Sequence, residues 1–96
     1  MATYIVLGNF TEQGIKTVKD SPSRYEAFKS AAGKNDVTFK SVYWTVGQYD
    51  LVATVEGTDE AVTAALLKLA AQGNVRTQTL RGYSADEFKT LLAKAV

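Results

Sequence analysis

The residues best suited to chemistry lie in the short string Gly47-Gln48-Tyr49-Asp50, between two segments with the character of strands. Tyr49 and Asp50 place a phenol and a carboxylate together at the mouth of an expected hairpin. A partly buried aspartate there can act as a general base or bind the ammonium group of a ligand. A structural interpretation is also open, because glycine supplies the positive φ of a tight turn and aspartate accepts hydrogen bonds from nearby backbone amides.

Other polar and aromatic side chains could complete a site around this string. Arg76, on an expected strand, either faces solvent at a sheet edge or pairs with a carboxylate, that of a ligand or that of Asp50. Trp44 either fills a core or an interface, or lines a pocket together with Tyr43. The ligand-binding candidates are Gly47, Tyr49, Asp50, Tyr43, Trp44, Arg76, Thr77 and Asn9.

The composition of the 96 residues excludes several classes of chemistry. Because the chain has no cysteine, disulfides, thiolate catalysis and cysteine-based metal sites are ruled out. The absence of histidine removes the commonest general base and the commonest metal ligand, so we expect no metal and no cofactor. A net charge of +1 is too small to argue for nucleic acid or an anionic membrane as partner, and we expect neither. The densest basic group, Lys16, Lys19, Arg24 and Lys29, is interpreted as a solvated helix face.

The pattern of elements predicts the fold that must position these residues. Strands are expected over residues 4–10, 37–46, 50–56 and 75–80. Helices are expected from Pro22, from a cap at Thr58, and from a capping box formed by Ser84 and Glu87. The order β-α-β-β-α-β-α predicts an α+β protein, a ferredoxin-like sandwich with an extra C-terminal helix, in a single domain over residues 1–96.

Both faces of the expected sheet carry large apolar side chains, although two helices can cover only one of them. Strict alternation groups Phe39 and Tyr43 with Tyr4, Val6, Phe10, Leu51, Ala53 and Val55, and groups Val42, Trp44 and Val46 with Ile5, Leu7, Val52 and Leu80. An apolar second face needs a cover, which two sheets packed face to face would provide. We therefore expect a homodimer or higher oligomer. The alternative is that the C-terminal helix folds back over this face within one chain.

The Gly-x-Tyr-Asp pattern of Gly47, Tyr49 and Asp50 resembles the signature of the GYD-domain family of small bacterial proteins. The flanking strings that fit are residues 4–15, 20–22, 41–45 and 73–81, so the resemblance covers nearly the whole chain. It implies a ferredoxin-like protein of the dimeric α/β-barrel type, and it brings no assigned biochemical function.

A more distant resemblance concerns mechanism. The string 47–50 and the alternating run Gly73-x-Val75-x-Thr77-x-Thr79 are similar to the effector domain of leucine-responsive and asparagine-type transcription regulators. That resemblance implies sheet-to-sheet dimers that bind amino acids at subunit interfaces near the hairpin turn. This chain has no helix-turn-helix, so the resemblance extends to the sensing half alone.

Three classes of function are compatible with these observations. The first, which we favour, is an oligomeric small-molecule-binding or regulatory protein of the cytoplasm, with its site near residues 47–50 at a subunit interface. The second is a cofactor-independent enzyme of the isomerase or oxygenase type. The third is a structural protein whose sheet face serves only to assemble copies of the chain. The sequence identifies neither the ligand nor any reaction.

Overall fold

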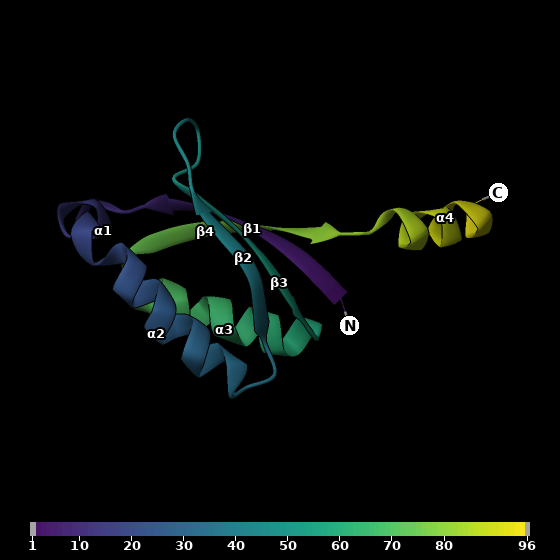
Figure 1. The fold of residues 1–96 in the computed structure, drawn as a ribbon, viewed down its shortest axis with the longest axis horizontal. Helices are drawn as coiled ribbons and strands as arrows, with labels where there is room; N and C mark the ends of the chain where they lie inside the picture. Colours follow the sequence, from purple (N-terminus) through teal and green to yellow (C-terminus); the bar gives the residue numbers. More distant parts are fainter. Residues whose placement is uncertain (1, 96) are drawn as a thin grey trace.

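The computed structural model describes residues 2–95, and its elements follow the expected order (Figure 1). The strands are β1 (Ala2–Phe10), β2 (Thr38–Trp44), β3 (Leu51–Gly57) and β4 (Val75–Gly82). The helices are α1 (Glu12–Lys16), the short 3-10 helix η1 (Val18–Asp20), α2 (Ser21–Gly33), α3 (Asp59–Ala71) and α4 (Ala85–Lys94). The strands form one antiparallel sheet in the order β2-β3-β1-β4, and α2 and α3 lie on one face of it. The predicted ferredoxin-like α+β fold is confirmed.

The helices begin where the sequence supplies their caps. The Thr58 hydroxyl accepts a hydrogen bond from the Ala61 backbone N–H and caps α3, and Pro22 occupies the first turn of α2. In α4 the Ser84 hydroxyl accepts from the Glu87 N–H, and the Glu87 carboxylate accepts from the Ser84 N–H. These hydrogen bonds, the backbone one first, lower the pKa of the Glu87 carboxyl. The predicted caps at Thr58 and Ser84 are thus confirmed.

The core lies between the sheet and the helices α2 and α3. Alternation along the two central strands turns Tyr4 and Val6 of β1, and Ala53 and Val55 of β3, toward the helices. Small side chains of the helices pack against them: Ala32 from α2, and Val62 and Ala65 from α3. Because these side chains are small, we expect each to contribute at most about 1.5–3 kcal/mol on burial, so the core is thin.

A β-bulge in β2 overturns one detail of the expected pattern. Phe39 pairs with Val55 and Ser41 pairs with Thr54, so Lys40 is an extra residue in the strand. Beyond the bulge the alternation is reversed, which places Val42 and Trp44 on the same side as Phe39, toward the helices. The prediction that Tyr43 shares a face with Phe39 was therefore wrong, because a strict period of two does not survive a one-residue insertion.

The other sheet face is left uncovered by the described part of the chain. We call it the open face, and its apolar residues are Ile5, Leu7, Tyr43, Val52 and Leu80. Helix α4 does not fold back over it but projects beyond the end of β4 (Figure 1). Its apolar side chains Phe88 and Leu92 are 52% and 55% exposed. The projection makes the molecule 49 Å long, with a radius of gyration of 14.5 Å. None of the helices within residues 2–95 has the length and apolar character needed to cross a bilayer.

Candidate functional site

Asp50 links the two central strands of the sheet, β1 and β3, at one end. Its carboxylate oxygen Oδ2 accepts a hydrogen bond from the Phe10 backbone N–H at 2.9 Å. Its own backbone N–H donates to the Gly8 carbonyl at 2.9 Å, and its carbonyl accepts from the Thr45 N–H at 2.8 Å. These contacts extend the pairing of β1 with β3 by one residue. The geometry favours the structural interpretation of Asp50 and leaves its second carboxylate oxygen for other partners.

The loop between β2 and β3 is anchored at its base and open at its tip. The Tyr49 hydroxyl donates to Gln78 Oε1 of β4 at 3.1 Å, and the Thr45 hydroxyl donates to the Tyr49 carbonyl at 2.6 Å. Gly47 has a φ of +138°, and a Cβ built on it would meet no atom within 4 Å. The expectation that Gly47 supplies a positive φ is confirmed.

The open face carries several of the predicted site residues. Tyr43 pairs with Val52, Val52 with Leu7, and Leu7 with Gln78, so these four form one row across the sheet. Asn9 of β1 and Arg76 of β4 are register partners. They lie close to Gln78, the end of the row that the Tyr49 hydroxyl contacts. Within residues 2–95 Arg76 forms no ion pair with Asp50.

The sheet separates the remaining predicted residues from this group. Trp44 lies on the helix side, where its indole N–H donates to the Ser21 hydroxyl oxygen at 3.0 Å and its ring meets Tyr25 edge to face at 5.9 Å. Thr77, the register partner of Gly8, lines a shallow groove beside α3. A ligand bound at Asn9 and Arg76 would therefore not touch Trp44 or Thr77.

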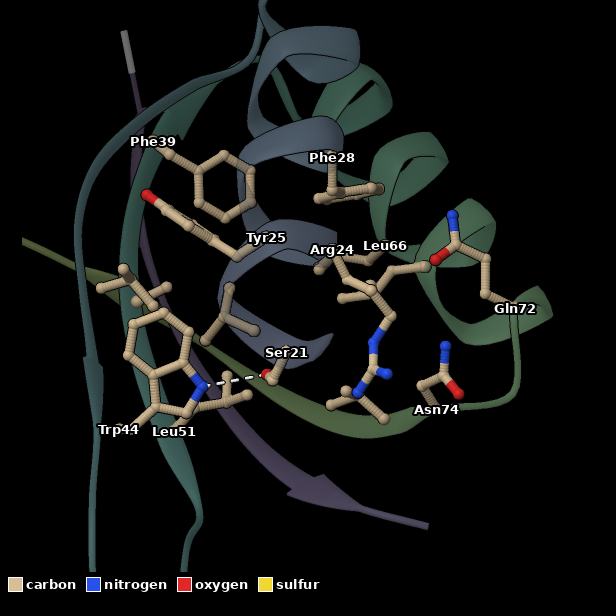
Figure 2. A pocket seen from close by; sticks show the side chains of 15 residues that line it. Ser21, Arg24, Tyr25, Phe28, Phe39, Trp44, Leu51, Leu66, Gln72 and Asn74 are labelled. Carbon is tan, nitrogen blue, oxygen red and sulfur yellow. Dashed lines mark hydrogen bonds between the residues drawn. The ribbon is translucent and has the colours of Figure 1, made fainter. Parts of the chain in front are cut away.

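A cavity of about 60 Å³ lies on the helix side, between the sheet, α2 and α3 (Figure 2). One wall is aromatic, with Tyr25 and Phe28 of α2 packed edge to face against Phe39 of β2 at 5.8 and 5.7 Å. Partial burial, and secondarily the Glu26 carboxylate, raise the pKa of the Tyr25 phenol, which stays neutral at physiological pH. The polar lining residues other than Tyr25 are Ser21, Arg24, Gln72 and Asn74.

Sequence reasoning missed this cavity. It grouped Arg24 with a solvated basic face, whereas the structure directs the Arg24 side chain into the lining of the cavity, between Ser21 and Asn74 in the view of Figure 2. The available signal was the start of α2 at Ser21-Pro22, which places Ser21 and Arg24 in the first turn of a helix that must face the sheet. In the described residues 2–95, no group of three or more acidic side chains could hold a metal ion.

We expect the Asp50 carboxylate to contribute to stability through its hydrogen bond to Phe10. Asp50→Ala removes the acceptor of a part-buried N–H and should lower the free energy of unfolding by about 1–3 kcal/mol. Asp50→Asn keeps an oxygen acceptor and should cost less than half as much. Urea unfolding followed by circular dichroism measures both, and equal stability of Asp50→Ala and the unaltered protein would contradict this role.

Comparison with known proteins gives the geometry its context. The sequence model of the GYD domain family matches residues 4–92 of this chain. A curated relative from Thermus thermophilus, named glutamine synthetase and cystathionine beta-lyase binding protein, is 37% identical over 82 residues, which are 83% of this chain and 86% of the relative.

Two solved structures resemble this fold. The crystal structure of TTHA0845 from Thermus thermophilus has a TM-score of 0.53 at 29% identity, over 88% of this chain and 96% of that chain. The crystal structure of FFRP-DM1 has a TM-score of 0.60 at 20% identity, over 86% of this chain and 100% of that chain. The second likeness shows a shared fold alone, which agrees with the resemblance to the effector domain of leucine-responsive and asparagine-type regulators.

The match to the family model runs from the first strand into the last helix and includes the Gly47, Tyr49 and Asp50 signature. The chain therefore belongs to the GYD domain family.

Proposed function

We propose that the chain is a regulatory binding protein of the cytoplasm, which self-associates and, in assembled form, binds an enzyme of amino-acid metabolism. The support for an enzyme partner is the name of the Thermus relative, which this chain matches over most of both lengths. The structural observation that carries the proposal is the uncovered apolar surface of the open face and of helix α4.

The occupant of the open face in this proposal is a second copy of the chain. One face of an antiparallel sheet can remain in water when it is polar, but this one presents Ile5, Leu7, Val52 and Leu80 along its central strands and β4. The same chain also carries an amphipathic helix, α4, whose apolar stripe does not pack on its own sheet. Packing two sheets face to face, with each α4 against the neighbouring copy, would cover both surfaces.

The predicted small-molecule site would lie at the edge of this interface. Asn9 and Arg76 are adjacent on the open face, and the Tyr49 hydroxyl reaches the neighbouring Gln78 from the loop. A second copy that covers the apolar rows would bring this polar end close to another subunit. A metabolite bound there could then link the state of the assembly to the binding of the enzyme.

Binding to purified enzymes tests the proposal. Glutamine synthetase and cystathionine β-lyase from the same organism are passed over the immobilised protein in biolayer interferometry, and light scattering gives its oligomeric state. We expect an oligomer that binds at least one of the two enzymes saturably, with a dissociation constant below about 100 µM.

Two variants with equally exposed targets form a matched pair. Tyr43 on the open face and Leu67 on α3 are both 66% exposed. Tyr43→Asp should weaken self-association and enzyme binding at least tenfold, whereas Leu67→Asp should change neither. A monomeric protein, or a folded oligomer that binds neither enzyme, would contradict the proposal.

A further inference from the structure

We propose that the helix-side cavity is a binding site for a small aliphatic carboxylate, which the Arg24 guanidinium recognises. This site lies on the opposite side of the sheet from the open face and does not depend on the proposed function. The inference rests on the hydrogen bonds of the side chains at the polar end of the cavity, on the charge of its lining, and on its size.

Arg24 presents a fixed and incompletely satisfied guanidinium. Its Nη1 donates to the Thr17 carbonyl and to the Thr17 hydroxyl oxygen, both at 3.0 Å. Its Nη2 is buried and has no hydrogen-bond partner within residues 2–95. Arginine stays charged at all ordinary pH values, and a buried guanidinium N–H strongly favours an acceptor. The two bonds to Thr17 hold the group in place, so it is preorganised for a ligand.

The neighbouring polar groups also offer donors. The Ser21 hydroxyl oxygen, itself buried, accepts from the Trp44 indole N–H, which leaves the Ser21 O–H free to donate. Asn74 Oδ1 accepts from Gln13 Nε2, which leaves the Asn74 amide nitrogen as a donor. Arg24, Ser21 and Asn74 line the same cavity (Figure 2). A group that only accepts hydrogen bonds, such as an ionised carboxylate, matches this set.

The charge of the lining selects an anion. Apart from Arg24, every residue that lines the cavity is neutral, and none is an aspartate or glutamate. The positive charge of Arg24 therefore has no counter-charge in the cavity wall. A carboxylate ligand would supply it and would form charge-assisted hydrogen bonds with the buried Nη2.

The rest of the cavity fits a compact apolar body. Apolar side chains that line the cavity include those of Phe28, Phe39, Val42 and Leu66. The volume of about 60 Å³ is several times the roughly 10–15 Å³ that a cavity needs to hold one water. That space suits a branched aliphatic acid of a few carbons, and it is too small for a nucleotide. We therefore infer a branched short-chain monocarboxylate as the ligand class.

The only tryptophan of the chain provides the test. Trp44 lines the cavity and is hydrogen-bonded to Ser21, so a ligand there changes the surroundings of its indole. Isovalerate is titrated into the purified protein while tryptophan fluorescence is recorded, with isovaleramide as a neutral probe of the same shape and sodium chloride as an ionic-strength control. We expect a saturable change with isovalerate, and at least tenfold weaker binding of isovaleramide.

Two arginines give a matched pair of variants. Arg24→Gln should weaken isovalerate binding at least tenfold, whereas Arg81→Gln, on β4 and outside the lining of the cavity, should leave it unchanged. Arg24→Lys keeps the charge but loses the two-pronged donor and should bind with intermediate strength. Equal binding of isovalerate and isovaleramide, or unchanged binding by a folded Arg24→Gln protein, would overturn the proposal.

Nuclear magnetic resonance of the unaltered protein keeps the test decisive if the Arg24 variants do not fold. In ¹H–¹⁵N spectra, isovalerate should shift the Trp44 indole signal and the backbone amides of Thr17 and Asn74. Shifts confined to the loop around Gly47, or no shift with saturating isovalerate, would contradict a site in this cavity.

Discussion

Gly14→Ala is expected to destabilise the fold severely, although it adds a single methyl group. An ideal Cβ built on Gly14 lies 2.0 Å from the backbone carbonyl oxygen of Asn74, far inside contact distance. That carbonyl accepts a hydrogen bond from the Thr11 N–H, and the Thr11 hydroxyl in turn accepts from the Gly14 N–H. Relief of the clash must move α1 away from the start of β4 and break these hydrogen bonds. We expect a loss of about 3–5 kcal/mol, a large share of the ~5–15 kcal/mol that holds a domain of this kind folded.

Gly33→Ala is the matched control, because it makes the same chemical change at the end of α2. A Cβ on Gly33 meets no atom within 4 Å, and the residue is helical. Alanine there should stabilise the protein by about 0.4–1 kcal/mol, since it restricts the unfolded chain. Thermal unfolding measures both, with roughly 4–8 °C expected for each kcal/mol in a chain of this size. A Gly14→Ala protein with the same melting temperature as the unaltered protein would show that the close contact between α1 and the start of β4 is not rigid.

The second large effect is expected from helix α4. Phe88→Asp combined with Leu92→Asp should turn the oligomer into a monomer and leave the sheet and the other helices intact. Both side chains are more than half exposed in the single chain, so the double variant removes little from its core. If assembly buries both, with about 1.5–3 kcal/mol for each, the dissociation constant should rise by at least about 100-fold.

Light scattering after size-exclusion chromatography, over a range of concentrations, measures this effect. Thr90→Asp combined with Ala93→Asp adds the same charge on the opposite side of α4 and should leave the mass of the oligomer unchanged. The role of α4 is refuted if the two double variants have the same mass, or if the unaltered protein is already a monomer at the highest concentration.

Local signals were sufficient for most of the fold. Caps act within one helical turn, so Thr58 and the Ser84–Glu87 pair could be read from adjacent residues, and Ser21-Pro22 marked the start of α2. The bulge at Lys40 could not be read in this way, because the segment 37–46 is apolar on both sides and alternates poorly in either register. The direction of α4 also lay beyond the sequence, since an apolar stripe specifies that a helix needs a partner but not which one.

The candidate sites were harder to predict than the fold. The sequence singled out Asn9, Tyr49, Asp50 and Arg76, which the structure gathers at one end of the sheet, but it could not place Trp44 and Thr77 on the other side. Arg24 escaped notice because its distinguishing property is tertiary. A fully exposed arginine and a partly buried one have the same spacing along a helix, and only the contact with Thr17 of the preceding turn decides where the guanidinium points.

The projecting α4 has a consequence for how the chain senses its own abundance. A helix of ten residues without a packed face is marginal in water, and its capping box offsets only part of the cost of ordering it. If a neighbouring copy supplies the packed face, winding of α4 and assembly become one coupled equilibrium. The helical content of this segment would then follow the concentration of the protein, and a dilute cell extract would hold chains whose last turns are unwound and accessible to proteases.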